Sequence, residues 1–227
     1  MSNQIPNDSL YQAVRTVIRR RKTSKVLGSI EQPPAIDAET LTRGDSLVRQ
    51  SIDDAGWAPF HFDRHVDEIA EPWRVCLLRH SSCKYISRQL SAWFTDMKPG
   101  NKMPALLTAC GCVVLVTWIP QKAAAGEDPA KLVNVNEEHL AATAAFVQNL
   151  LLLLDAGGMK TYWSSGGLLK SQLAFDKLGI SRDQQLIACI FVDYAAGDST
   201  RAVEFAGGGQ REKRSPSSRW TTEIVLP

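Results

Sequence analysis

The sequence lacks an excess of charge of either sign. Its 227 residues include 26 lysines and arginines against 24 aspartates and glutamates, a formal net charge of +2. A global field that would select nucleic acid or an anionic membrane is not indicated, so neither partner is predicted. Histidine is also scarce, with four residues, none at a spacing with carboxylates that is typical of a metal site. We predict no metal centre.

Cysteine is sparse, and its spacing is irregular. The five residues form an odd, scattered set, which argues against the disulfide framework of a small secreted domain. The N-terminal stretch MSNQIPNDSL is polar and lacks the apolar run of a signal peptide. Together these features predict a protein of the reducing cytoplasm. Cys110 and Cys112 form a C-x-C pair, which we interpret as small buried hydrophobic residues rather than metal ligands.

Motifs of the common nucleotide-binding and hydrolase folds are missing as well. The sequence has no G-x-G-x-x-G dinucleotide fingerprint, no P-loop and no G-x-S-x-G elbow. A separate Rossmann domain for a nicotinamide is therefore excluded. The length fits one large domain or two small ones, and it is sufficient to bury a core.

Hydrophobic periodicity predicts a mixture of helices and strands, in an α+β or three-layer arrangement. Helices are expected over residues 8–22, 38–57, 81–97, 136–156 and 168–178, and strands over residues 73–78, 112–119, 160–164 and 185–194. Residues 120–134 read as irregular, and residues 220–226 are β-prone. The segment 136–156 is the most apolar, but Gln148 and Asn149 interrupt it, so we predict a buried central helix rather than a membrane span.

Two basic clusters stand out from the balanced composition. They consist of Arg19, Arg20, Arg21, Lys22 and Lys25 near the start, and of Arg211, Lys213, Arg214 and Arg219 near the end. The first cluster follows an amphipathic helix, where the negative end of the helix dipole favours solvated cations. Alternatively, both clusters converge on one phosphate, whose oxygens pair with guanidinium forks. Composition alone favours the solvated helix end. A single-stranded nucleic-acid site is disfavoured because interleaved aromatic residues are missing.

The order of several segments resembles a known family. These are RRRKTSKVL (19–27), AGWAPFHF (55–62), EPWRVCLL (71–78), AATAAFVQNLLLLLDAGGMKTYWSSGGL (141–168), LGISRDQQLIACIFVDYAAG (178–197) and KRSP (213–216). In this order they resemble the nitroreductase family of FMN-dependent oxidoreductases, in its small single-domain bacterial branch. The resemblance implies one domain over residues 1–227. It also implies a three-layer α+β fold with a central mixed β-sheet flanked by helices, and an intertwined homodimer in which residues 200–227 wrap the partner.

The resemblance also implies which residues hold FMN. The motif that grips the phosphate and ribityl chain falls on Arg20, Arg21 and Lys22, or one step later on Arg21, Lys22 and Thr23, and we favour the first register. The other implied contacts are Lys25 or Lys22 near the flavin ring, Trp57, Ala58, Pro59 and His61 from the partner subunit, Trp163, Ser164, Ser165 and Gly166 along the ring, and Lys213 or Arg214 at the phosphate, with Arg211 a weaker candidate. Assigning both clusters to the phosphate replaces the solvated-end interpretation.

The activity implied by the resemblance is an FMN-dependent reductase. NADPH or NADH would reduce the flavin and leave, and a small electron-poor substrate would then take its place in a ping-pong cycle. The flavin carries the chemistry, so no catalytic side chain is predicted. The sequence departs from the family after Pro59, where many members have Ser and Asn and this chain has Phe60 and His61. A flavin carrier or sensor without efficient turnover is the alternative, and a structural dimer without flavin is a third possibility.

Overall fold

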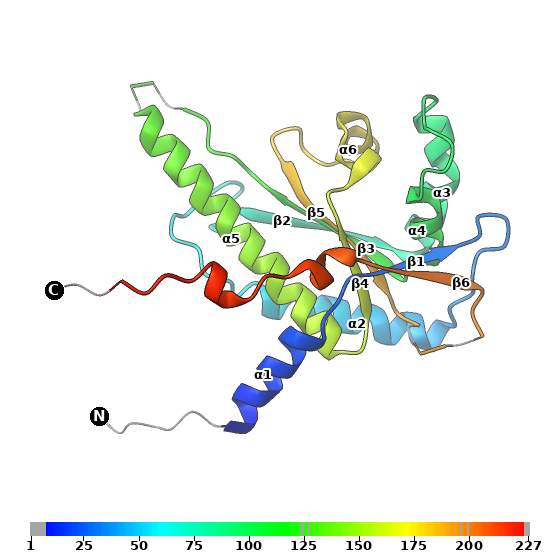
Figure 1. The fold of residues 1–227 in the computed structure, drawn as a ribbon. Helices are drawn as coiled ribbons and strands as arrows, with labels where there is room; N and C mark the ends of the chain where they lie inside the picture. Colours follow the sequence, from blue (N-terminus) through cyan, green and yellow to red (C-terminus); the bar gives the residue numbers. More distant parts are fainter. Residues whose placement is uncertain (1–7, 124, 127, 196, 199, 225–227) are drawn as a thin grey trace.

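A four-stranded sheet forms the centre of the fold (Figure 1). The computed structural model describes residues 8–123, 125–126, 128–195, 197–198 and 200–224. The strands are β2 (Trp73–Arg79), β3 (Cys112–Trp118), β4 (Lys160–Ser164) and β5 (Gln185–Asp193), in the spatial order β2-β3-β5-β4 with antiparallel neighbours. All four strands predicted from the sequence are confirmed.

The inner strand β3 has apolar side chains on both faces of the sheet, so both faces are covered. Each of its residues is buried, and Cys112, Val114 and Val116 pack on one face while Val113 and Leu115 pack on the other. Period-two alternation in a run that is apolar throughout gives this result, because both faces of the strand need a hydrophobic layer.

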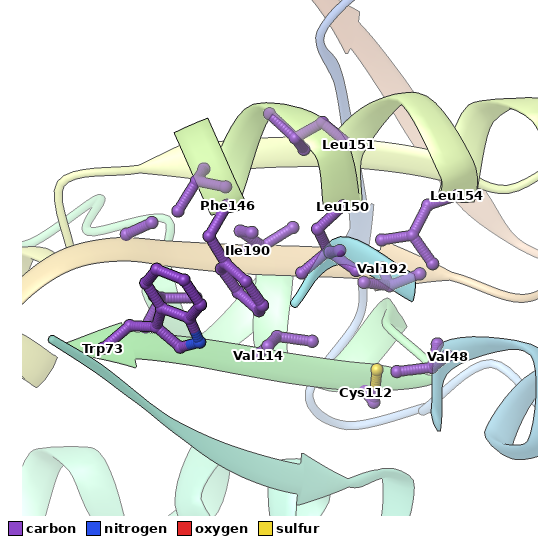
Figure 2. Packing of buried hydrophobic residues seen from close by; sticks show 14 of the residues in the cluster. Val48, Trp73, Cys112, Val114, Phe146, Leu150, Leu151, Leu154, Ile190 and Val192 are labelled. Atoms are coloured by element: carbon purple, nitrogen blue, oxygen red, sulfur yellow. The ribbon is translucent and has the colours of Figure 1, made fainter. Parts of the chain in front are cut away.

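The first face is covered by α2 (Ala38–Ala55) and the long helix α5 (Pro129–Ala156). Asp37 caps α2, since its side chain accepts a hydrogen bond from the backbone N–H of Thr40 at 2.8 Å. Figure 2 shows the core between α5 and the sheet, where Phe146 stacks on Trp73 with ring centroids 5.3 Å apart. Leu150 and Leu154 continue the same buried face of α5.

The opposite face is covered by shorter elements. They are α3 (His80–Trp93), α4 (Met103–Ala109), the 3-10 turn η1 (Gly167–Lys170) and α6 (Gln172–Leu178). Figure 1 shows α3 and α6 on the side of the strands opposite to α2, which gives three layers. The expected helix over 168–178 is divided here, because Ser171 ends η1 and caps α6 through a hydrogen bond to the N–H of Ala174.

Helix α5 begins earlier than the sequence pattern predicts. Asp128 accepts a hydrogen bond from the N–H of Ala130 at 2.9 Å, and Pro129 occupies the first helical position. The expectation of irregular structure over residues 120–134 is therefore wrong from Pro129 onward. By length and apolar composition α5 would also suffice to cross a membrane, so the interruption by Gln148 and Asn149 does not by itself exclude a span. Its buried face packs on the sheet, as a core helix does.

A second, two-stranded sheet was not predicted. Strand β1 (Ser24–Gly28) pairs antiparallel with β6 (Val203–Gly207), so segments about 180 residues apart lie side by side. An isolated parallel bridge between Thr23 and Thr161 links this ribbon to β4, so one parallel contact accompanies the antiparallel pairing within the two sheets. Strand β1 follows helix α1 (Asp8–Arg20) closely in the chain. Helix α1 confirms the first helix predicted from the sequence.

The chain after β6 runs along the surface. It contains two 3-10 turns, η2 (Gly209–Lys213) and η3 (Ser217–Arg219), and residues 207–224 are exposed. The β-prone stretch from Trp220 forms no strand as far as Ile224, and the rest of that stretch lies outside the described residues. The expected wrapping of a partner by residues 200–227 stays a prediction.

Candidate functional site

The first half of the candidate site lies where α1 passes into β1. Extended backbone places alternate side chains on one face, so Arg21, Thr23 and Lys25 form a row. At about 3.3 Å per residue the row spans about 13 Å. A row of this length offers an arginine and a hydroxyl at one end and an ammonium group at the other.

The structure separates Arg20 from Arg21. Arg20 is engaged at the end of α5, where its Nε lies 3.0 Å from Asp155 Oδ2 and its guanidinium donates to the Asp155 carbonyl at 2.8 Å. Arg21 is partly buried, and its Nε atom is buried with no hydrogen-bond partner among the described residues. Burial lowers the pKa of Arg21; Asp155 raises it, and Arg211 lowers it further. The geometry favours the second register, which begins at Arg21, over the first.

The C-terminal basic cluster meets the first cluster at this point. The Arg211 guanidinium donates to the backbone carbonyls of Arg19 and Arg21, across almost the whole length of the chain. A pocket of about 670 Å³ opens beside this contact, and its lining residues are Ile18, Arg19, Arg211, Arg214, Ser215 and Pro216. Three guanidinium groups around one pocket form the kind of site that binds a phosphate.

Other predicted residues lie beside this pocket or outside it. Lys22 and Lys213 are exposed, and neither is among the residues that line it. Arg19 and Ser215 line the pocket although the sequence analysis did not select them, and Arg211, the weaker candidate, lines it as well and bonds the Arg19 carbonyl. The sequence pointed to Arg19 only through its place in the basic cluster. The structure is needed to show that the end of α1 brings Arg19 to the pocket.

The other end of the row lies against β4. The Lys25 ammonium group is 4.9 Å from the centroid of the Tyr162 ring, and Tyr162 stacks on Phe191 with centroids 5.9 Å apart. On the β6 side, the Lys160 ammonium lies 4.0 Å from the Phe205 ring centroid. Aromatic rings therefore line the joint between the two sheets and hold two lysines there.

The predicted ring-binding segment is the end of β4. Gly166 has φ of +102°, and an added Cβ would lie 2.3 Å from the Leu186 side chain, so only glycine fits. Its N–H donates to the Ser164 hydroxyl at 3.2 Å. Ser165 is exposed beside this turn, whereas the Trp163 indole donates to the Ile187 carbonyl at 3.3 Å and packs in the core on the α5 side. Of this turn, only Ser165 is exposed, Ser164 is half-buried and Gly166 is buried, and Trp163 is chiefly a packing residue.

The segment from Trp57 to His61 lies elsewhere in the chain. It follows α2 and borders a pocket of about 300 Å³ that Pro59, Phe60 and His61 share with α5 residues Glu138, Ala141, Ala142 and Ala145. Ala58 is buried, but the Trp57 side chain is 89% exposed. Along α5, Ala142 lies about 20 Å from Asp155, which holds the first half of the site through Arg20. One chain therefore keeps the two predicted halves apart.

The loop after His61 is fixed in place rather than loose. Arg64 donates to the carbonyls of Ile119 and Pro120 at 2.8 and 3.0 Å, and Arg74 donates to the carbonyl of Val66 at 2.6 Å. Behind the loop, burial lowers the pKa of His139, and the charge of Arg64 lowers it further, so His139 is a neutral core residue. These hydrogen bonds from arginines to backbone carbonyls hold the loop after His61, where the sequence departs from the pattern of the family that it resembles, in a defined conformation.

The residues at the α1–β1 junction fit FMN. The Arg21 Nε, buried with no partner among the described residues, and the guanidinium groups of Arg19 and Arg214 provide donors for a phosphate dianion, and Arg211, which also bonds the carbonyls of Arg19 and Arg21, adds positive charge. Lys25 lies on the ribbon, and residues Ser164–Gly166 form the end of β4 and the turn after it; the Thr23–Thr161 bridge joins the ribbon to β4. Phosphate donors at one end, and an ammonium group near the turn that exposes Ser165 at the other, fit the two ends of FMN.

Comparison with known proteins identifies the fold. No family model matches the sequence, and no curated protein matches it either. A nitroreductase-like family protein from Bacillus cereus matches with a TM-score of 0.63 and 21% identity, over 99% of this chain and 98% of that one. The FMN-dependent nitroreductase NfnB from Mycobacterium smegmatis, solved with NADPH, matches with a TM-score of 0.58 and 15% identity, over 95% and 100%. The chain therefore has the nitroreductase fold, as the sequence predicts.

A third structure has the same fold and holds the cofactor that the sequence predicts. This nitroreductase-type protein from Desulfovibrio desulfuricans was solved in complex with FMN, and it matches with a TM-score of 0.56 and 16% identity, over 99% of this chain and 100% of that one. At these identities the similarity establishes the fold, and the assignment of FMN to this chain rests on its own residues.

Proposed function

We propose that this protein is an FMN-dependent oxidoreductase of the nitroreductase type, formed by the whole chain as one domain and working in the cytoplasm. The observation that carries the proposal is the buried Nε of Arg21, which has no partner among the described residues, together with a pocket lined by Arg19, Arg211 and Arg214, of which Arg211 donates to the Arg21 carbonyl. A buried N–H without a hydrogen-bond partner is costly, and a phosphate oxygen would accept from it. The nitroreductase fold makes FMN the phosphate-bearing ligand of choice.

The chain's own residues divide the work between binding and electrostatics. Arg21, Thr23 and Arg214 bind the phosphate end, the Ser164–Gly166 backbone supports the ring, and the Lys25 ammonium stabilises negative charge at the ring's far end. When bound, FMN supplies the redox chemistry, accepting a hydride from NADPH or NADH and passing it to a small electron-poor substrate in ping-pong order. The absence of a dinucleotide fingerprint in the sequence agrees with a nicotinamide that uses this pocket only transiently.

A homodimer is part of the proposal because one chain holds only half of each site. The Trp57 side chain and the apolar face of α1, formed by Leu10, Tyr11, Val14 and Ile18, are exposed in the single chain. Exposed apolar surface of this kind marks an interface. A second copy would cover both surfaces and bring its own Trp57–His61 segment over the flavin held by Arg21.

The visible absorption spectrum of the purified protein tests the cofactor and the reaction together. We expect flavin bands after reconstitution with FMN, and we expect NADPH or NADH to bleach them under anaerobic conditions. Heat-released flavin, identified by chromatography, should be FMN. A colourless protein that ignores added FMN would overturn the proposal and leave the structural dimer.

A carrier or sensor without efficient turnover is the second candidate. The observation in its favour is the fixed loop after His61, because Arg64 and Arg74 hold it against backbone carbonyls near the expected substrate side. FMN that stays oxidised with both nicotinamides, yet is reduced by dithionite, would select this function over the reductase.

The dimer gives a separate prediction. Val14→Glu places a charge in the apolar face of α1 and is expected to weaken self-association at least about tenfold, because a buried carboxylate without a partner is costly. FMN affinity should fall with it, since the site needs both chains. Sedimentation over a concentration series should give twice the 25.0 kDa chain mass for the unmodified protein and a shift toward one chain for the variant.

Thr16→Glu serves as the matched control for the dimer prediction, because Thr16 is exposed and lies on the opposite side of α1. It adds the same charge and should leave both the mass and the FMN affinity unchanged. An unmodified protein that stays monomeric at high concentration while holding FMN would contradict the shared site.

A further inference from the structure

Lys25 has an unusual environment for a lysine in a cofactor site. Its ammonium lies 4.9 Å from the centroid of the Tyr162 ring, and within the described ranges it takes part in no ion pair. Lys25 is only partly exposed, so its position against the ring is defined by packing. The negative face of the aromatic ring attracts the cation.

The ring itself is held firmly. Tyr162 stacks on Phe191 of the adjacent strand β5, with centroids 5.9 Å apart and an interplanar angle of 17°. Lys25 and Tyr162 belong to different strands, which the Thr23–Thr161 bridge brings together. A rigid ring on β4 therefore fixes a flexible side chain that comes from β1.

An aromatic partner has a different consequence for Lys25 from a carboxylate partner. A carboxylate would neutralise the ammonium, and the field that it projects would largely vanish. A ring carries no net charge, so it orients the ammonium and leaves its full positive charge directed outward. The arrangement suits a lysine whose task is to stabilise an anion that appears during a reaction.

We propose that Tyr162 is a positioning residue that holds the Lys25 ammonium where negative charge develops on the bound flavin, and so raises the flavin's reduction potential. The proposal rests on the proposed function and adds a residue that acts through Lys25. Thermodynamically, Tyr162 should strengthen the binding of reduced FMN more than the binding of oxidised FMN.

The test compares Tyr162→Leu, which removes the ring, with Tyr162→Phe, which keeps it. In the leucine variant the affinity for reduced FMN relative to oxidised FMN should fall by about two- to thirtyfold, the range of one cation–π contact. A tenfold fall corresponds to a potential about 30 mV lower for this two-electron couple. The phenylalanine variant should retain the potential of the unmodified protein.

Two further measurements keep the proposal separate from the function on which it rests. In the flavin-free protein, ring-current shifts of the Lys25 ε-methylene protons should be present, should persist in Tyr162→Phe and should vanish in Tyr162→Leu. Lys25→Met should lower the potential, and adding Tyr162→Leu to it should cause no further fall, because the ring acts only through the lysine.

The outcomes are distinct. If Lys25→Met lowers the potential but Tyr162→Leu leaves it unchanged, the positioning role is wrong while the FMN site stands. If the unmodified protein binds no FMN, the proposed function fails, and the positioning role falls with it even where the ring-current shifts are present. A loss of potential that is equal in Tyr162→Phe and Tyr162→Leu would also overturn the proposal, since the ring would then not be its source.

Discussion

Replacing Arg21 by alanine is expected to weaken FMN binding by about ten- to a hundredfold, the loss typical of one hydrogen bond to a charged group. The Nε of Arg21 is buried and has no hydrogen-bond partner among the described residues, so this N–H can be donated to a phosphate. Fluorescence titration of the flavin-free variant with FMN measures the change. Riboflavin, which lacks the phosphate, should bind the variant and the unmodified protein equally.

Arg20→Ala is the matched comparison, because it removes a neighbouring arginine that already has a partner. Arg20 pairs with Asp155 and its side chain is 55% exposed, so its loss should change FMN affinity by less than about threefold. Arg88→Ala on α3 controls for one positive charge at an exposed position. If Arg20→Ala abolishes binding and Arg21→Ala does not, the register that begins at Arg20 is correct and the one that begins at Arg21 is wrong.

Replacing Arg201 by methionine is expected to destabilise the fold strongly. Its guanidinium lies 2.5 Å from Asp193 Oδ1 and donates to the Ala109 carbonyl at 2.7 Å, and the side chains of Arg201 and Asp193 are 2% and 1% exposed. Removing one partner leaves the other charge buried, which costs about 3–5 kcal/mol. Urea unfolding of the variant and the unmodified protein at one protein concentration measures the loss.

Two further variants show whether the cost comes from the orphaned charge. Arg201→Met combined with Asp193→Leu removes both charges and should recover most of the stability, since apolar pairs often replace buried ion pairs without loss. Arg182→Met breaks an exposed pair with Asp176 and should leave the free energy of unfolding almost unchanged. A double variant no more stable than Arg201→Met alone would show that the geometry of the pair, rather than its charge balance, holds the fold.

The sequence predicts the elements whose own pattern determines them. Strands β3 and β5 are long apolar runs, and α2 has its apolar stripe and an Asp37 cap, so local patterning was sufficient. Strands β1 and β6 escaped prediction because their short sequences, SKVLG and VEFAG, are largely polar or small and gain their order from each other. Long-range pairing of this kind leaves little trace in either segment alone.

The candidate site shows the same division. The basic clusters, the Trp57–His61 segment and the WSSG turn were recognisable as motifs, because each has its own local composition. The choice between Arg20 and Arg21 was not recognisable, since it depends on Asp155 at the far end of α5. Tyr162 was not selected because its contact is with a lysine from another strand, and an aromatic residue in a strand is usually interpreted as packing.

The spacing imposed by α5 has a consequence for newly made protein. The helix keeps the Trp57–His61 pocket about 20 Å away from the Arg20–Asp155 contact. On the proposed arrangement, a single subunit therefore has only part of each FMN site. Newly synthesised chains would then bind no FMN and could not oxidise NADPH or NADH until they form a dimer. Activity would require a subunit concentration above the dissociation constant of the dimer, and dilution below that concentration would abolish it.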